Sequence, residues 1–223
     1  MRLIPILCCC ALAAPSWGAA VTYAFDRSLR YADMDRDGQV DDIPVWNLAF
    51  TLTARTRVEF DLRAAEYQDY NNAQQLTGSR VDLNGDGRIS GFDGQLRLFN
   101  AARTQVAEND DYTGALNRDG SISRLDSAMA VTLNPGDYTL ALGVWDFSIA
   151  QALAGTQLNR AGTLYRLYGT GPDAPFRLSL RSPTATVTSV NFNPAVPEPG
   201  TIALLALGGG LFAWWSRRRQ LAC

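Results

Sequence analysis

"AMAVTLNPGDYTLALGVW", residues 128–145, decides the fold. Two runs of alternating apolar and polar side chains flank the tetrapeptide Asn134–Asp137. A period of two places the apolar side chains on one face of a strand and the polar ones on the other. Proline presets φ and glycine accepts a positive φ, so the tetrapeptide predicts a tight turn. We expect a β-hairpin with one buried face.

The same kind of pattern recurs on both sides of this stretch. Further runs rich in β-branched and aromatic residues predict strands at 45–53, 57–62, 95–100, 176–181 and 186–192. Residues 63–76 are polar and fit either a helical turn or a loop, and 148–175 fits a loop with one strand. Seven or more short strands with frequent turns predict an all-β, antiparallel β-sandwich over residues 21–194, jelly-roll-like or Greek-key-like.

Residues 1–20 have the layout of a secretory signal peptide. Arg2 precedes an apolar stretch from Leu3 to Ala14, and small residues follow up to Val21. This layout predicts export and cleavage after Ala20. Three of the four cysteines lie in this segment and the fourth is Cys223, so we expect neither disulfides nor a thiolate metal site in the domain.

The charged residues narrow the classes of function. All 20 basic residues are arginine, 18 of the 22 acidic residues are aspartate, and there is no histidine. Without the two end segments, 16 basic and 21 acidic residues remain, a net charge of −5, which disfavours a nucleic-acid partner. The lack of histidine excludes Ser-His-Asp and Cys-His nucleophile systems. A hydrolase with paired carboxylates is the remaining enzymatic alternative, but no motif positions such a pair, so we expect no enzymatic activity.

The stretch "DLNGDGRISGFD", Asp82–Asp93, has the spacing of a calcium loop. Glycine stands at position 6, and a strand pattern follows directly. Calcium takes six to eight oxygen ligands, and a compact loop of this spacing supplies them together with one backbone carbonyl. Position 12 is Asp rather than Glu, so the loop resembles that of dockerins more than that of EF-hands. The alternative is a hydrophilic turn that binds no ion. The predicted ligands are Asp82, Asn84, Asp86, the carbonyl of Arg88, Ser90 and Asp93.

A second stretch, "DMDRDGQVDD", repeats the Asp-x-Asp-x-Asp-Gly opening. Its position 12 is Pro44, which has no side-chain ligand, so Asp42 or water would have to complete the shell. The predicted ligands of this second possible calcium loop are Asp33, Asp35, Asp37, Asp41 and Asp42. A third acidic cluster, residues 108–112 with 117–120 and Asp126, lacks loop spacing and is interpreted as a solvated turn region. We expect any calcium to be structural, holding acidic loops together.

The segment "AVPEPGTIALLALGGGLFAWWSRRRQ", residues 195–220, joins a proline-rich turn, an apolar run and an arginine cluster. The run Thr201–Trp215 has 15 residues, and as a helix it would reach about 22 Å, short of the roughly 30 Å hydrocarbon core. Arg217–Arg219 would stay cytoplasmic. The segment therefore predicts a weak transmembrane anchor with the domain outside the inner membrane.

This tail resembles the PEP-CTERM sorting signal in all three parts, with Pro197, Glu198 and Pro199 as its motif. The resemblance implies recognition by an exosortase, a membrane cysteine protease that cuts near the motif. It also implies release to, or attachment at, the surface of an exopolysaccharide-producing Gram-negative bacterium. It implies nothing about what the domain does.

A second resemblance covers residues 92–112 and 123–145. They are similar to β-sandwich domains related to the bacterial pre-peptidase C-terminal family. The similar elements are Leu96–Asn100, Asn109–Asp111, Leu125–Ser127 and Pro135–Tyr138. The resemblance implies a non-catalytic domain, with relatives that bind calcium or extracellular polymers. The loop Asp82–Asp93 is extra to this pattern.

Together these features predict an exported, non-catalytic, calcium-stabilised protein of the cell surface or extracellular matrix. Its expected partners are the exosortase and, transiently, the inner membrane. The alternative is a carbohydrate- or ice-binding module of the exopolysaccharide matrix. Its candidate aromatic residues are Trp46, Tyr67, Tyr70, Trp145, Tyr165 and Tyr168. We expect Trp46 and Trp145 to pack in the core instead, because they lie in strand patterns.

Overall fold

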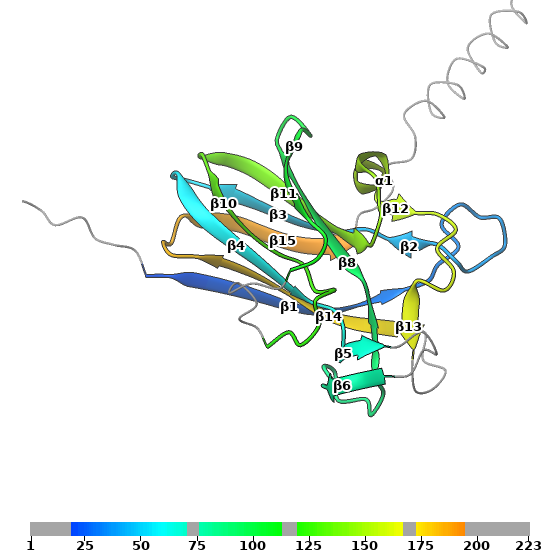
Figure 1. Cartoon of the computed structure of the whole chain (residues 1–223). Coiled ribbons are helices and arrows are strands. Elements are labelled where there is room, and N and C mark those ends of the chain that lie inside the picture. Colours follow the sequence, from blue (N-terminus) through cyan, green and yellow to red (C-terminus); the bar gives the residue numbers. More distant parts are fainter. Residues whose placement is uncertain (1–18, 71–75, 113–119, 167–172, 195–223) are drawn as a thin grey trace, which may run out of the picture.

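The computed structural model describes residues 19–70, 76–112, 120–166 and 173–194 (Figure 1). These residues form antiparallel sheets and one short helix, α1 (Ile149–Ala154), which confirms the prediction of an all-β antiparallel fold. The strands of the four-stranded sheet are β1 (Val21–Arg30), β14 (Asp173–Ser182), β4 (Thr56–Arg63) and β10 (Ala128–Leu133). Those of the five-stranded sheet are β15 (Val187–Pro194), β3 (Trp46–Leu52), β11 (Gly136–Val144), β8 (Gly94–Asn100) and β9 (Gln105–Asn109). Three short pairs lie outside these sheets: β2 (Ile43–Pro44) with β12 (Thr156–Gln157), β5 (Tyr67–Tyr70) with β6 (Leu76–Arg80), and β7 (Ser90–Phe92) with β13 (Leu164–Arg166).

The order of the nine strands in the two large sheets is that of a jelly roll. Numbered along the chain, the four-stranded sheet has the order 1-8-3-6, and four strands of the other sheet have the order 2-7-4-5. Strand 9, which is β15, adds to the edge beside β3. Most connections therefore cross between the sheets, as in two interlocked Greek keys.

The core lies between these two sheets, whose apolar faces meet. Phe50 of β3 and Phe60 of β4 bring their ring centroids within 5.7 Å, and Trp46 of β3 lies 5.8 Å from Phe176 of β14. Leucines from both sheets complete one continuous buried cluster. The alternation seen in the sequence thus buries one face of each strand against the opposite sheet.

The predicted turn at Asn134–Asp137 does not form a hairpin. β10 pairs with β4, whereas β11 pairs with β3 and β8, so Asn134 and Pro135 carry the chain from one sheet to the other. The hairpin prediction is wrong for a physical reason. Alternation specifies which face is buried, and the turn residues specify a reversal, with Gly136 at φ 145°. Both are the same whether two strands lie side by side or face each other across the core.

Helix α1 packs on the outer face of the five-stranded sheet. Ser148 caps its start in a capping box with Gln151, and Gly155 ends it in the left-handed conformation with φ 81°. Ala152 is buried against a small apolar cluster that includes Phe99 and Ala141. The prediction of a loop with one strand over residues 148–175 does not include this helix, because only six residues are helical and one of them is buried.

Three predicted features fall outside the described residues: most of the signal peptide (residues 1–20), the apolar run Thr201–Trp215 and the arginine cluster. Among the residues that the structure describes, no helix has the length and apolar character needed to cross a membrane. The first strand, β1, begins at Val21, directly after the predicted cleavage point.

Candidate calcium loops and the sorting segment

Of the two predicted calcium loops, residues 33–42 come earlier in the chain and are called here the first acidic loop. This loop connects β1 to β2. One carboxylate oxygen each from Asp33, Asp35 and Asp37 lies within 4.8 Å of the others, and all three side chains are exposed. Three backbone N–H groups donate hydrogen bonds to these carboxylates and curve the loop around them. Those of Asp37, Gly38 and Gln39 donate to the side chains of residues 35, 33 and 37, at 3.1, 3.2 and 2.8 Å. The loop thus gathers three of its five predicted ligands at one point.

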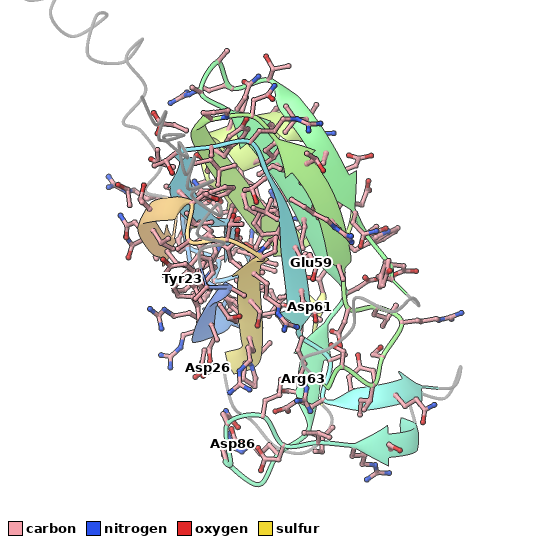
Figure 2. All side chains as sticks on the ribbon, turned by 90° about the vertical axis from the view of Figure 1, so that its left-hand side faces the viewer. Tyr23, Asp26, Glu59, Asp61, Arg63 and Asp86 are labelled. Carbon is pink, nitrogen blue, oxygen red and sulfur yellow. The ribbon has the colours of Figure 1, made fainter. Side chains whose placement is uncertain are left out.

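The second acidic loop, residues 82–93, lies between β6 and β8 and includes the short strand β7. Figure 2 shows Asp86 in this loop, beyond the end of β4 that carries Arg63. The N–H of Gly87 donates to Asp82 at 2.7 Å, that of Asp86 to Asn84 at 3.2 Å, and that of Arg88 to Asp86 at 2.8 Å. These bonds join loop positions 6 to 1, 5 to 3 and 7 to 5, as in the first acidic loop. The two loops therefore share one backbone arrangement.

These amides also set the charge of the first ligand position. Hydrogen bonds to the carboxylate from the N–H groups of Gly87, Gly85 and Asp86 hold the pKa of Asp82 below its usual value against the opposing effect of burial. Asp82 therefore stays ionised to a lower pH than an unperturbed aspartate, which suits its predicted role as a calcium ligand.

A buried carboxylate anchors the first acidic loop from its far end. Asp42 is fully buried, and its Oδ2 accepts hydrogen bonds from the N–H of Met34 at 2.7 Å and of Asp35 at 3.1 Å. Its Oδ1 accepts from the N–H of Asn159 at 3.0 Å. Burial raises the pKa of Asp42, but these three amides outweigh it and leave the pKa lowered. Both carboxylate oxygens of Asp42 thus accept hydrogen bonds from backbone amides. A calcium ion bound by Asp42 would have to share these oxygens with the amides.

Glu66 performs the same task for the second acidic loop. It is 1% exposed and follows β4 in the chain. Its carboxylate accepts from the N–H of Leu83 at 2.6 Å, and from the N–H and hydroxyl of Ser90 at 2.7 and 3.0 Å. Burial raises the pKa of Glu66, and these hydrogen bonds oppose the shift without cancelling it. In both loops, a buried carboxylate thus holds the N–H at loop position 2.

Asp41, the position-9 residue of the first acidic loop, adds a further negative charge. Burial raises its pKa, and the carboxylates of Asp37, Asp42 and Asp35 raise it further. The first acidic loop therefore carries five carboxylates over ten residues, with no basic side chain but Arg36 among them.

The six ligands predicted for the second acidic loop are not all brought together. The carboxylates of Asp82, Asp86 and Asp93 do not form a group within 4.8 Å, and the hydroxyl of Ser90 donates to Glu66. Strand pairing explains the position of Asp93. The chain passes from β7 straight into β8, and the carbonyl of Asp93 accepts from the N–H of Trp145 at 2.7 Å. A helix, which would fold the loop back on itself, does not follow.

Asp93 instead joins Asp110 and Asp111 in a separate group, with one oxygen of each within 4.8 Å of the others. Burial raises the pKa of Asp93 from 3.8 to about 7, Asp110 and Asp111 add to the shift, and Arg124 opposes it. Burial and Asp111 likewise raise the pKa of Asp110. The Oδ1 atoms of Asp93 and Asp110 are buried and have no hydrogen-bond partner among the described residues. The acidic stretch after β9 is thus partly buried, which corrects its interpretation as a solvated turn region.

Sequence reasoning missed the roles of Glu66, Asp110 and Asp111. Glu66 lies sixteen residues before the second acidic loop, in a polar stretch without motif spacing. The Asn-Asp-Asp turn is visible in the sequence, but its approach to Asp93 depends on how β8 and β9 pair. Only contacts between distant parts of the chain reveal these three carboxylates.

Three of the six candidate aromatic side chains lie in the described part of the chain. Tyr67 is buried, and Trp46 packs against Phe176 and Phe192, as expected. The expectation of core packing is wrong for Trp145, which is 51% exposed because β11 ends one residue earlier. These three form no exposed row. The side chains of Tyr70, Tyr165 and Tyr168 lie outside the described residues.

Comparison with known proteins identifies the tail. Residues 195–220 match the model of the PEP-CTERM protein-sorting motif, which begins directly after β15 ends at Pro194. No curated protein matches the chain. The resemblance of the middle of the chain to the pre-peptidase C-terminal family stays a prediction. The chain therefore carries a PEP-CTERM sorting motif, which supports export and processing by an exosortase.

Proposed function

We propose that this chain is an exported, non-catalytic protein of the cell surface or extracellular matrix, whose jelly-roll domain is stabilised by calcium. The observation that carries the calcium part is the meeting of Asp33, Asp35 and Asp37 in the first acidic loop. The sorting motif after β15 supports the delivery part.

The chemistry of the loop favours a hard divalent cation. Calcium takes oxygen ligands from carboxylates, backbone carbonyls and water, and two compact loops here present carboxylates at positions 1 and 5. The shared hydrogen bonds and the buried anchors Asp42 and Glu66 hold each loop in shape beforehand, so little ordering is left for the ion to impose. The first acidic loop also has repulsion to relieve, because its carboxylates lie close together in an exposed turn.

The expected stabilisation is modest. Extracellular calcium sites bind with a Kd of about 10⁻⁴ to 10⁻³ M. At roughly millimolar calcium, the tighter end of this range adds about 1.4 kcal/mol to the free energy of unfolding. For a domain of this size, that corresponds to a rise of about 3–6 °C in Tm.

Thermal unfolding of the purified protein in chelator and in millimolar calcium tests the calcium part. We expect calcium to raise the Tm and magnesium to do so far less, because magnesium gives up its water reluctantly. Equal Tm values in chelator and calcium, together with no heat of calcium binding by titration calorimetry, would refute it.

The delivery part has its own test. We expect replacement of Pro197, Glu198 and Pro199 by alanine to leave uncut precursor at the inner membrane, because the exosortase reads this motif. Alanine replacement of the neighbouring Asn191 and Asn193 on β15 is the matched control and should leave processing unchanged. Immunoblotting of the membrane fraction and the medium measures processing. Normal release of the motif variant would contradict the proposal.

Polysaccharide binding is the weaker alternative. Jelly rolls occur among lectin domains, but a fold does not specify a ligand. Only Trp145 among the described candidate aromatics is exposed. A glycan array probed with the wild-type protein and the Trp145→Ala variant tests polysaccharide binding. Specific binding by the wild-type protein that is lost in the variant would support this alternative.

A further inference from the structure

The large apolar side chains that the described residues expose are unevenly distributed. Five of the six come from two segments, the first acidic loop and the segment 145–160 that follows β11. Their exposed fractions range from 40% to 67%. These five, called here the apolar end, are Val40, Trp145, Ile149, Leu153 and Leu158. The sixth, Val106, lies on β9.

Backbone hydrogen bonds join the two segments. β2, which follows the first acidic loop, pairs with β12. The N–H of Arg160 donates to the carbonyl of Asp41 at 2.7 Å. Ile149 and Leu153 are four residues apart in α1 and therefore lie on the same side of the helix, while Ala152 faces the protein. The five side chains thus belong to one structural unit rather than to scattered loops.

The chain leaves the domain at this unit. Pro194, the last residue of β15, pairs with Trp46. The residue before Trp46, Val45, donates its N–H to the carbonyl of Gly155, the cap of α1, at 3.0 Å. Figure 1 shows the end of β15 near α1, β12 and β2, at the opposite end of the sandwich from the start of β1.

The connection to the tail is short. The apolar run of the sorting segment begins at Thr201, seven residues after Pro194. Seven residues span at most about 25 Å when fully extended. While the run lies in the bilayer, Pro194 cannot be farther than this from the hydrocarbon, and the headgroup region alone takes up about 5–8 Å of the distance. The end of the domain that carries the exposed apolar side chains therefore faces the membrane.

We propose that the apolar end docks on the lipid surface of the inner membrane in the uncut precursor. Tryptophan is favoured at the bilayer interface, and Ile149 and Leu153 on one side of α1 suit shallow insertion among headgroups. Asp33, Asp35 and Asp37 lie in the same unit and disfavour anionic lipid, so the partner is a zwitterionic headgroup region. Docking would hold the cleavage motif at the membrane surface, within reach of a membrane-embedded protease. After cleavage the domain would lose its tether and leave.

This inference rests on the delivery part of the proposed function, and the experiment separates the two. The exported precursor, which lacks residues 1–20 and has Trp214 and Trp215 replaced by phenylalanine, is reconstituted into vesicles of phosphatidylcholine and phosphatidylethanolamine. The vesicles contain either ordinary lipid or lipid brominated near the headgroup. Flotation reports whether the tail anchors the protein, and tryptophan fluorescence reports whether Trp145 touches lipid.

We expect the precursor to float and bromine to quench at least a third of the fluorescence. The added Trp145→Phe substitution should abolish the quenching, because the remaining Trp46 packs against Phe176 and Phe192. Ile149→Ser with Leu153→Ser should weaken it at least twofold, whereas Val106→Ser on β9 should leave it unchanged. A precursor that floats with equal fluorescence in both lipids overturns this inference alone. A precursor that does not float overturns the membrane anchoring on which it depends as well.

Discussion

The first and second acidic loops begin alike and end differently. Both open with the same spacing and fold with the same three hydrogen bonds to side chains at positions 1, 3 and 5. In the first acidic loop three carboxylates then meet, whereas in the second Asp93 joins Asp110 and Asp111. Local sequence spacing therefore determines the backbone conformation of positions 1 to 7 of such a loop. Strand pairing elsewhere determines which oxygen atoms lie near its last position.

The largest expected effect concerns the buried anchors. Asp42→Ala and Glu66→Ala each leave three donors of the folded protein without their acceptor, so we expect a loss of about 3 kcal/mol or more in the free energy of unfolding. Asp37→Ala and Asp86→Ala, at exposed position 5, are the matched controls and should cost less than about 1 kcal/mol in chelator. Urea unfolding measures all four. If the anchor variants were no less stable than the controls, the anchoring role would be wrong.

The next effect separates the loops by their response to calcium. Only the first acidic loop brings three of its own carboxylates together, so Asp35→Ala should remove most of the calcium-induced stabilisation, about 1 kcal/mol. Asn84→Ala, at the same position of the second acidic loop, should remove less. The measurement is the difference in Tm between calcium and chelator for each variant. The reverse order would mean that the second acidic loop is the principal site.

A smaller effect tests where Asp93 belongs. Its pKa in the folded protein is raised to about 7 from 3.8, so the folded state holds the proton more tightly than the unfolded state. Asp93 therefore lowers the stability progressively as the pH rises from 3.8 to about 7. In chelator, Asp93→Asn should flatten the dependence of stability on pH in this window and stabilise the protein above it. Asp137→Asn, on β11, serves as the control.

The same Asp93→Asn variant sharpens the comparison in calcium. Since Asp93 is not part of the first acidic loop, the stabilisation that depends on Asp35 should survive the substitution. Complete loss of the calcium response in Asp93→Asn would instead place the main ion at the group formed with Asp110 and Asp111.

Much of the fold follows from local sequence. All seven strands predicted from alternation are present, with boundaries shifted by at most three residues. β1 and α1 are not among the predicted elements, although Val21, Tyr23 and Phe25 alternate in β1, and Ser148 and Gln151 form a capping box at α1. The crossing at Asn134–Asp137 could not be predicted, because the turn residues carry no information about which sheet receives the next strand.

The candidate site also has a part that local sequence predicts and a part that it does not. The turn-forming residues and the carboxylates at positions 1, 3 and 5 follow from spacing, because each hydrogen bond spans only a few residues. Glu66 and Asp110 could not be foreseen, because strand pairing brings them to their partners: Ala65 bridges to Gly91, and β9 pairs with β8. Sequence spacing therefore predicts where an ion could be held, and the fold decides how its shell is completed.

The most direct test of the central claim is a crystal structure of the domain grown in millimolar calcium, with anomalous diffraction to locate the ion. We predict a calcium peak between Asp33, Asp35 and Asp37, with oxygen ligands at about 2.3–2.6 Å. An ordered first acidic loop without such a peak would contradict calcium stabilisation at this loop.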